Sequence, residues 1–449
     1  MKRDNPGNKK AAERLEVVYR RIEELKLDPG NPRLHSARHI RQIAKSIKTF
    51  GMVAPILIDR ADTVVAGHGR VLACQQLGRT EVPTIPLEHL TDAQAKAYLI
   101  ADNRLAENSE WDERLLAEQL KQLSELRLDF ALDVTGFEIG EIDLRIEELS
   151  TGSDRDEARA DAVPDPLTGK SVTRLGDTWI LNDHRVLCGS ALEKASYAAL
   201  MQGEKAQMVF TDPPYNVAID GNATGSGKTH HREFLMASGE MSEQQFTRFL
   251  TTACSLLANH TSTGSLHFVC IDWRHLVELL AAGRKAYGDL FNLCVWVKNN
   301  GGLGSFYRSQ HELVLVFKSG AGSHRNNVQL GQFGRNRTNV WQYQSATSFS
   351  RSGDEGNLFS VHPTIKPATL VADAIMDCTS RHDVVLDGFL GSGTSVIAAE
   401  RTGRRCYGLE IDPIYVDVIV KRWQAFTRQT AYHAQTRKSF AETEAEVRR

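Results

Sequence analysis

The spacing of apolar residues predicts two folded regions separated by a polar segment. Between residues 20 and 150, short β-like runs at 55–58 and 63–65 mix with a helical period over 114–128. This mixture predicts a small α+β domain. Residues 151–173 are polar and rich in Asp, Arg, Ala, Pro and Gly, so we expect a linker there.

Strands and helices alternate after this linker, over residues 174–427. A hairpin is expected from residues 178–181 and 185–188. Further strands are predicted at 207–211, 265–270, 293–297, 312–317, 384–387 and 405–410, and helices at 244–257, 273–282, 369–379, 395–401 and 415–427. Such alternation predicts an α/β domain whose largely parallel sheet carries helices on both faces. Residues 428–449 are polar and are expected to form a loosely ordered tail.

Composition constrains the partners and the compartment. The chain has 449 residues and a formal net charge of −2, so any nucleic-acid surface is local and not a global basic field. The seven cysteines are scattered without a C-x-x-C spacing, which argues for a reducing cytoplasm with neither a disulfide framework nor a metal site. The N-terminus is polar and no apolar stretch reaches membrane-spanning length, so we expect a soluble cytoplasmic protein without a membrane partner.

A glycine-rich turn follows the predicted strand that ends at Asp387. Gly391 and Gly393 allow backbone to approach a ligand closely, and a helix begins near Thr394. Glu410 closes the next strand about 20 residues on, a spacing at which a carboxylate reaches ribose hydroxyls. The third glycine of the dinucleotide fingerprint is replaced by Val396, which disfavours NAD and FAD. An adenosine-containing cofactor fits this pattern, and so does an ordinary glycine-rich β–α turn.

A second motif, Asp212-Pro213-Pro214-Tyr215, ends the apolar run before it. The exocyclic amine of a nucleobase is a poor nucleophile because it is conjugated into its ring. The Asp212 carboxylate and the Pro213 carbonyl can accept both amine hydrogens and favour a pyramidal nitrogen. The two prolines stiffen the loop and offer no N–H that would compete, and Tyr215 gives a flipped-out base a stacking face. The alternative is a proline turn in which Asp212 is only a cap.

The two motifs in this order resemble the permuted group of DNA N6-adenine/N4-cytosine methyltransferases, which place a His-Pro-Thr-x-Lys-Pro element, here His362 to Pro367, between them. The resemblance implies a Rossmann-like fold, double-stranded DNA as partner, and S-adenosyl-L-methionine as methyl donor. It implies cofactor contacts from Asp387, Phe389, Gly391, Gly393, Thr394, Glu410, Lys366 and His362. Because Asp-Pro-Pro-Tyr is commoner among adenine enzymes, adenine N6 is the first choice; cytosine N4 and RNA bases remain alternatives.

Two departures from the family motifs support a rival hypothesis. The chain has Gly388 where the family usually has Pro, and Ser190 where it commonly has Asp. A nucleotide-gated DNA-binding protein with a decayed methyltransferase half would tolerate both changes. The intact motif at Asp212 favours the enzyme.

Residues 300–355 have the composition of a target-recognition segment. From Lys298 to Arg351 the chain has seven Lys or Arg residues and one acid, Glu312, interleaved with aromatic residues, Asn, Gln and Ser. Basic groups suit phosphates and amides suit base edges, so we expect this segment to contact DNA.

The N-terminal region contains the motif Gly67-His68-Gly69-Arg70. With Asn31-Pro32-Arg33 and Val82-Pro83 it resembles the ParB and sulfiredoxin superfamily. The resemblance implies a turn whose amides and Arg70 hold nucleotide phosphates, so a nucleoside triphosphate is a candidate second ligand. His68 stands where sulfiredoxins have their catalytic cysteine, which disfavours sulfinic-acid repair. A phosphodiester-handling site, or a scaffold that only helps hold DNA, remains open.

Overall fold

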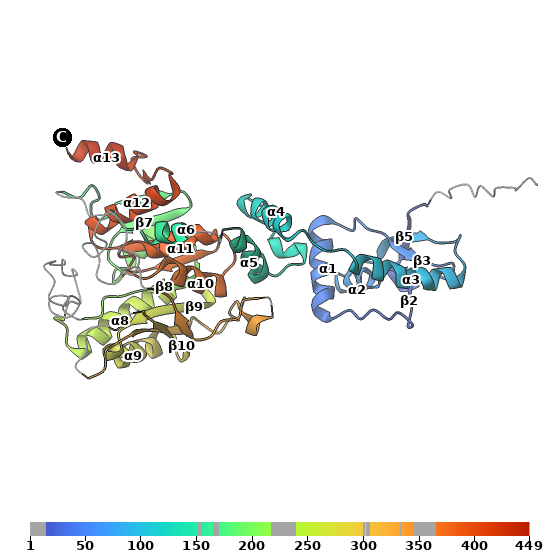
Figure 1. Ribbon diagram of the computed structural model, residues 1–449, viewed down its shortest axis with the longest axis horizontal. Coiled ribbons are helices and arrows are strands. Elements are labelled where there is room, and N and C mark those ends of the chain that lie inside the picture. The colour runs from blue at the N-terminus through green and yellow to red at the C-terminus, as the bar shows by residue number, and fades with distance from the viewer. Residues whose placement is uncertain are drawn as a thin grey trace, which may run out of the picture. The chain divides into compact units, whose positions relative to one another are not determined.

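The structure is a computed structural model that describes residues 15–150, 154–164, 170–216, 239–299, 301, 306–332, 334–344 and 365–448. The chain forms two compact units, Met1–Ile142 and Asp143–Arg449 (Figure 1). His362 and residues 345–355 of the predicted recognition segment lie outside the described residues. Within those residues, every helix is too short or too polar to cross a membrane.

The first unit contains a five-stranded sheet in the order β1-β5-β3-β4-β2. Its strands are β1 (Val18–Arg21), β2 (Lys26–Leu27), β3 (Ile56–Ile58), β4 (Thr63–Ala66) and β5 (Glu81–Pro86). Its helices are η1 (Ile22–Glu24), α1 (Ala37–Phe50), α2 (His68–Gln76), α3 (Asp92–Glu107), α4 (Glu113–Glu125), η2 (Leu132–Thr135) and the start of α5 (Ile139–Ser150). Helices α1 and α2 bury Ile47 and Val71 in one apolar cluster with Ile56 and Ile58 of β3. The predicted α+β fold of this region is confirmed.

The second unit contains a ten-stranded sheet in the order β12-β10-β11-β9-β8-β13-β14-β7-β6-β15. Its strands are β6 (Thr178–Leu181), β7 (His184–Cys188), β8 (Ala206–Thr211), β9 (Thr261–Ile271), β10 (Leu290–Val297), β11 (His311–Lys318), β12 (Val340–Gln342), β13 (Val384–Asp387), β14 (Arg405–Glu410) and β15 (Tyr432–His433). Its helices are α6 (Asp154–Asp161), α7 (Lys194–Met201), α8 (Glu243–Asn259), η3 (Trp273–His275), α9 (Leu276–Ala286), η4 (Gln329–Gly331), α10 (Ala368–Cys378), α11 (Thr394–Thr402), α12 (Pro413–Thr427) and α13 (Phe440–Val447).

Alternate residues of the central strands enter different cores, so the sheet is covered on both faces. In β9, Phe268 and Cys270 join the cluster formed with α10, α11 and α12. Val269 and Ile271, one position on, join the cluster formed with α8 and α9 (Figure 1). This period of two is the geometry of a strand buried on both sides. The predicted α/β sheet with helices on both faces is confirmed. It is mixed and not largely parallel, because β6 and β11 each pair antiparallel with both of their neighbours.

The strand directions bring the predicted site residues to one edge of this sheet. Strands β8, β13, β14 and β7 are parallel neighbours, so their carboxyl ends lie side by side. That edge carries Asp212 after β8, Asp387 at the end of β13 and Glu410 at the end of β14. Strand β11 runs antiparallel to β9, which is itself parallel to β8, so β11 begins at the same edge with Glu312.

The expectation of a linker over residues 151–173 is wrong for the part that the structure describes. Helix α6 ends with Ala160, which is fully buried, and Asp161, whose carboxylate accepts the Ala368 N–H at 2.8 Å where α10 begins. The backbone N–H groups of Val172 and Thr173 donate to the Asp417 carboxylate of α12. This segment docks through hydrogen bonds and little apolar area, so its polar composition concealed its role.

The expected loose tail over residues 428–449 is also wrong for its described residues. Strand β15 pairs with β6, and α13 begins with a capping box between Ser439 and Glu442. Phe440 is 1% exposed and its ring lies 5.1 Å from that of Trp179. The apolar anchors of this segment are few, Ala431 and Phe440, and the Ser-x-x-Glu signature that contains Phe440 was the signal that could have revealed the helix.

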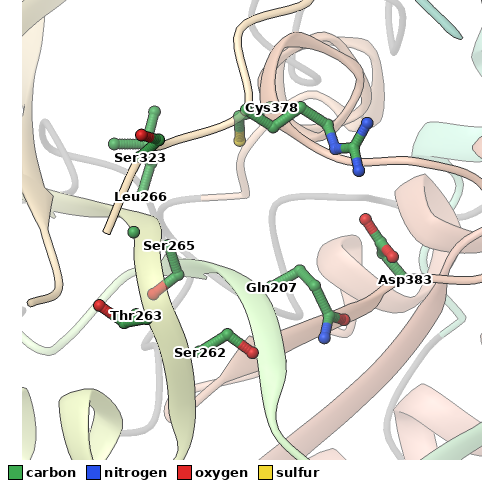
Figure 2. Close-up of a pocket in the computed structure, with 10 residues that line it drawn as sticks. Gln207, Ser262, Thr263, Ser265, Leu266, Ser323, Cys378 and Asp383 are labelled. Atoms are coloured by element: carbon green, nitrogen blue, oxygen red, sulfur yellow. The ribbon is translucent and has the colours of Figure 1, made fainter. Parts of the chain in front are cut away.

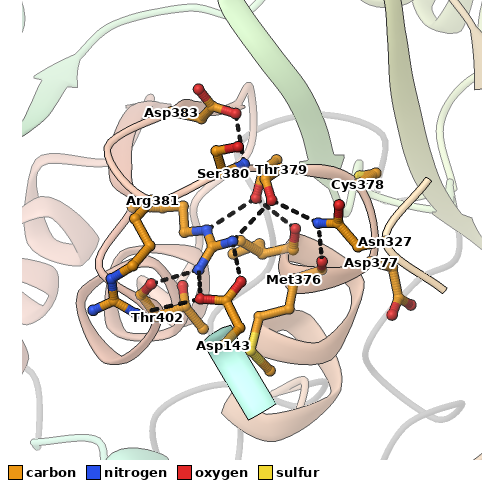
Figure 3. Close-up of polar contacts among 12 residues, drawn as sticks. Asp143, Asn327, Met376, Asp377, Cys378, Thr379, Ser380, Arg381, Asp383 and Thr402 are labelled. Carbon is orange, nitrogen blue, oxygen red and sulfur yellow. Dashed lines mark hydrogen bonds and ion pairs between the residues drawn. The ribbon is translucent and has the colours of Figure 1, made fainter. Parts of the chain in front are cut away.

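A buried ion pair within the second unit joins Asp143 of α5 to Arg404. The Arg404 guanidinium, just before β14, donates to the Asp143 carboxylate at 2.9 and 2.6 Å. In Figure 3, Asp143 lies among Thr379, Arg381 and Thr402. The remaining N–H groups of Arg404 donate to the backbone oxygens of Thr379 and Thr402 and to the Thr379 hydroxyl. All five guanidinium hydrogens therefore have acceptors, which a buried arginine needs.

Replacing Phe440 with Ala should destabilise the protein, because it removes a buried ring from the core around Trp179. We expect the free energy of unfolding to fall by about 3–5 kcal/mol, measured by urea unfolding followed by tryptophan fluorescence. Phe306→Ala, which truncates an exposed ring, is the matched control and should change little. A Phe440→Ala variant as stable as wild type would show that the C-terminal segment is not part of the core.

Replacing Asp143 with Ala should leave Arg404 buried without its carboxylate. The expected loss in the free energy of unfolding is about 3–5 kcal/mol, measured in the same urea titration. Glu446→Ala, which breaks the exposed pair with Lys438, should leave the transition near its wild-type midpoint. Equal midpoints for Asp143→Ala and wild type would contradict the anchoring role of this pair.

Candidate active site

The loop that carries Asp212 is fixed at both ends. It leaves the buried strand β8 at Thr211, whose hydroxyl donates to the Asp387 carboxylate at 2.8 Å. It ends at Asn216, a residue with a φ of 55°, whose side chain binds the backbone of Gly239 and Met241. Because the two prolines between them cannot rearrange freely, Asp212 is held at the edge of the sheet.

Asp212 belongs to a cluster of four charged side chains, which we call the catalytic ion cluster. Lys366 Nζ lies 2.6 Å from Asp212 Oδ2 and 2.8 Å from Glu312 Oε2. Lys298 Nζ makes a short ion pair with Glu312 Oε1. The Tyr215 hydroxyl donates to Asp212 Oδ1 at 2.5 Å and accepts from Lys366 at 3.2 Å. Two carboxylates and two ammonium groups therefore balance in charge.

Burial and neighbouring charges shift the pKa of each member. Burial raises the pKa of Asp212, and Lys366 opposes that rise. Burial would also raise the pKa of Glu312, but Lys366 and Lys298 lower it to about 2. Burial would lower the pKa of Lys366, but the two carboxylates hold it above its usual value. Lys366 and Glu312 therefore stay charged, while Asp212 is the more basic carboxylate.

The glycine turn after β13 is held by Asp387. Its carboxylate accepts the Phe389 N–H at 2.9 Å and the Ser395 hydroxyl at 2.7 Å, besides that of Thr211. Burial raises the pKa of Asp387 to about 6. With three donors already bound, this carboxylate orders the turn, and its predicted direct contact with cofactor stays a prediction.

Glu410 lies across the turn and keeps acceptor capacity. Its carboxylate accepts the N–H groups of Gly391 at 2.8 Å and Asp412 at 2.9 Å. An ionised carboxylate has about four acceptor positions, so roughly two remain for a ligand's hydroxyls. Burial raises the pKa of Glu410 to about 7. Gly393 has a φ of 84° and a Cβ there would meet Ile419 at 2.9 Å, so the turn requires glycine.

Two other predicted cofactor residues make protein contacts. The Thr394 hydroxyl accepts from the buried Arg422 at 3.1 Å, so it supports the start of α11. The Phe389 ring lies 5.8 Å from that of Phe249.

The structure also accounts for the glycine at 388. A Cβ at Gly388 would lie 3.2 Å from the Tyr197 hydroxyl, which fills the space a larger residue would need.

Lys366, which the sequence predicted to contact the cofactor, binds Asp212, Glu312 and Tyr215 in the structure. Its contact with the cofactor stays a prediction. The sequence did not reveal the roles of Glu312 and Lys298. The available signal was that Glu312 is the single acid in an otherwise basic segment.

Some basic residues of the segment that we expected to contact DNA form ion pairs within the protein. Arg335 and Arg337 pair with Asp373 and Asp377 of α10 at distances from 2.7 to 3.2 Å. With Lys298 bound to Glu312, three of the seven basic residues hold the segment in place. The expected contact of this segment with DNA stays a prediction, and it depends on the other basic residues.

The glycine turn of the first unit precedes α2 and contains buried polar atoms. Gly67, with a φ of 106°, caps α2. His68 is 8% exposed, and its Nε2 atom and the Nε atom of Arg70 are buried without a hydrogen-bond partner among the described residues. Burial lowers the pKa of His68, and the nearby His35 lowers it further. Buried polar atoms normally have hydrogen-bond partners, so His68 Nε2 and Arg70 Nε are candidates for contact with a ligand.

A cavity of about 220 Å³ lies within the second unit (Figure 2). Gln207 at the start of β8, Ser262 and Ser265 of β9, and Asp383 before β13 line it. These residues mark the amino ends of the parallel strands, the edge opposite to Asp212. The cavity is therefore separate from the catalytic ion cluster.

Sequence comparison matches three families along the chain. Residues 206–421 match a DNA methylase family, residues 7–103 the ParB N-terminal domain, and residues 114–175 the ParB-methyltransferase HTH domain. The ParB-like nuclease domain-containing protein YnaK of Escherichia coli is 45% identical over 83 residues, covering 18% of this chain and 95% of that protein. The type II methyltransferase M.HinfI of Haemophilus influenzae is 26% identical over 259 residues, covering 54% and 69%. M.ScaI of Streptomyces caespitosus is 36% identical over 98 residues, but only 32% of its length is covered.

Solved structures show weaker similarity. The M1.HpyAVI–SAM complex is 20% identical with a TM-score of 0.38, covering 53% of this chain and 97% of that one. The cytosine-N4-specific PvuII DNA methyltransferase is 15% identical with a TM-score of 0.41, covering 59% and 91%. Both scores are below 0.5, so the assignment depends on the sequence matches. The chain therefore contains a DNA methylase domain over residues 206–421, with a ParB N-terminal domain and a ParB-methyltransferase HTH domain ahead of it.

Proposed function

We propose that this chain transfers the methyl group of S-adenosyl-L-methionine to the N6 amine of an adenine flipped out of double-stranded DNA. The observation that carries the proposal is the placement of Asp212 and the glycine turn on neighbouring parallel strands, linked by the Thr211 to Asp387 hydrogen bond of 2.8 Å. A carboxylate for the amine and a turn for the methyl donor therefore lie at one edge of one sheet.

The residues of the turn fit an adenosine-containing donor. Glu410 retains acceptor positions for ribose hydroxyls, Gly391 presents backbone without a side chain, and Phe389 offers an apolar face. Ser190, which replaces the family's acid, already accepts the Leu192 N–H at 3.2 Å. When bound, the cofactor supplies an electrophilic methyl group on sulfur.

The Asp212 loop supplies the groups that activate the amine. The Asp212 carboxylate and the Pro213 carbonyl accept its two hydrogens, which returns electron density to nitrogen and directs its lone pair toward the methyl carbon. Transfer of that methyl group would leave the amine nitrogen with a positive charge and one proton to release. Asp212, whose pKa burial raises, is placed to accept that proton.

Adenine is proposed over cytosine because position 212 is Asp. In the group that this chain resembles, Asp-Pro-Pro-Tyr accompanies adenine more often and Ser-Pro-Pro-Tyr accompanies cytosine. Asp212 is held by Tyr215 and Lys366, so it is part of the site's charge balance and not an exposed loop residue.

A second ligand is proposed for the first unit: a nucleoside triphosphate at the N-terminus of α2. The buried, unpartnered Nε2 of His68 and Nε of Arg70 favour it, because a phosphate oxygen would satisfy both a cationic side chain and the free amides of a helix N-terminus.

Asp212→Asn should abolish most methyl transfer while leaving the fold intact, because the amide keeps the shape and loses the charge. We expect at least a ~100-fold loss of turnover, measured with labelled cofactor on plasmid DNA. Asp272→Asn, which changes the carboxylate after β9 that caps η3, is the control and should retain activity. Equal turnover by Asp212→Asn and wild type would refute the catalytic role.

Arg70→Ala should weaken nucleotide binding about tenfold or more, since it removes a charge-assisted contact. Calorimetry with ATP, CTP, GTP and UTP, each tested separately, measures this. Arg79→Ala changes an exposed arginine near the other end of α2 and should bind as wild type does. Absence of binding by wild type to all four nucleotides would contradict the proposal.

A further inference from the structure

Lys366 lies between two carboxylates instead of beside one. Its Nζ atom is 2.6 Å from Asp212 Oδ2, 2.8 Å from Glu312 Oε2 and 3.2 Å from the Tyr215 hydroxyl oxygen. An ammonium group has three hydrogens, so each has one acceptor. Lys366 therefore binds Asp212 Oδ2 and Tyr215 binds Asp212 Oδ1. These are the two oxygens that could accept a hydrogen of the target amine.

Lys366 and Glu312, which we call the inner residues of the catalytic ion cluster, are more deeply buried than Asp212 and Lys298. The side chains of Lys366 and Glu312 are 5% and 7% exposed, whereas those of Asp212 and Lys298 are 22% and 28% exposed. The Trp296 ring lies beside both ammonium groups, 5.0 Å from Lys298 Nζ and 5.8 Å from Lys366 Nζ. A buried ammonium that lost its partner here would be costly, so Lys366 needs a carboxylate at every stage of the reaction.

We propose that Glu312 is a positioning residue for methyl transfer: it holds Lys366 when that ammonium releases Asp212 to the amine hydrogens of the target base. The inference rests on the proposed function. Lys298 fixes Glu312 through its other oxygen, Oε1, so the acceptor for Lys366 is in place before the base arrives. When Lys366 releases Asp212, it loses one hydrogen bond but keeps Glu312 as its carboxylate partner.

The same geometry makes the charge on Asp212 depend on the two inner residues in opposite ways. Lys366 lowers the pKa of Asp212 and Glu312 raises it, on top of the rise caused by burial. Six titratable groups lie around Asp212 and come from every element packed against it. In chain order they are Tyr215 of the same loop, Cys270 of β9, Lys298 just after β10, Glu312 of β11, Lys366 just before α10 and Asp387 of β13.

The test compares Glu312→Gln and Glu312→Asp with wild type in steady-state methyl transfer. Glu312→Gln leaves Lys366 with Asp212 as its one carboxylate in the cluster, so we expect kcat to fall between about tenfold and hundredfold. Glu312→Asp keeps the charge and should recover part of that loss. Affinity for S-adenosyl-L-methionine by calorimetry should stay close to wild type, which shows that both variants are folded at the assay temperature.

The pH dependence of kcat provides a readout that a merely structural role would not move. Transfer needs ionised Asp212, so the acid limb of the profile follows its pKa. Glu312→Gln removes a charge that raises this pKa, and the acid limb should move to lower pH. Lys366→Met removes a charge that lowers it, and the acid limb should move to higher pH.

Glu278→Gln is the matched control, because Glu278 is a similarly buried carboxylate paired with His275 of η3 outside the cluster. It should keep wild-type kcat. Two results would overturn this inference and leave the proposed function standing. One is a wild-type kcat in Glu312→Gln. The other is an equal loss of kcat in Glu312→Gln and Glu312→Asp without the opposite pH shifts of Glu312→Gln and Lys366→Met. A wild-type chain that transfers no methyl group would overturn the proposed function and this inference with it.

Discussion

The site depends on the parallel pairing of β8, β13 and β14. Parallel strands end at the same edge of a sheet, so a residue that follows one strand becomes the neighbour of residues far away in the chain. The register that pairs Leu386 with Val209 and Asp387 with Gly408 places the Asp212 loop, the glycine turn and Glu410 side by side. The hydrogen bond from Thr211 to Asp387 then fixes the Asp212 loop to the glycine turn.

Charge balance is the second constraint at this edge. An isolated carboxylate in a half-buried site would be desolvated and protonated, and an isolated ammonium would be destabilising. The catalytic ion cluster solves both problems with two charges of each sign, at the cost of occupying the oxygens of Asp212. The proposed chemistry at Asp212 therefore involves an exchange of partners, in which Glu312 would keep Lys366 paired.

The sequence predicted the fold class and the catalytic and cofactor motifs because those depend on local patterns: apolar runs, a rigid Asp-Pro-Pro-Tyr loop and a glycine turn. It could not predict that Lys366 binds Asp212, because that contact joins residues 154 positions apart. It missed α6 and α13, where single residues such as Ala160 and Phe440 anchor otherwise polar segments. It assigned Arg335 and Arg337 to DNA because composition alone cannot show that Asp373 and Asp377 neutralise them.

The central claim is that Asp212 directs methylation of adenine N6 in duplex DNA. Long-read sequencing of DNA from cells that express the wild-type chain or Asp212→Asn tests it most directly, since it reports both the modified base and its sequence context. The account predicts N6-methylated adenines at a defined sequence in wild type and their loss in the variant. Methylated cytosines at that position, or identical modification in both cultures, would contradict it.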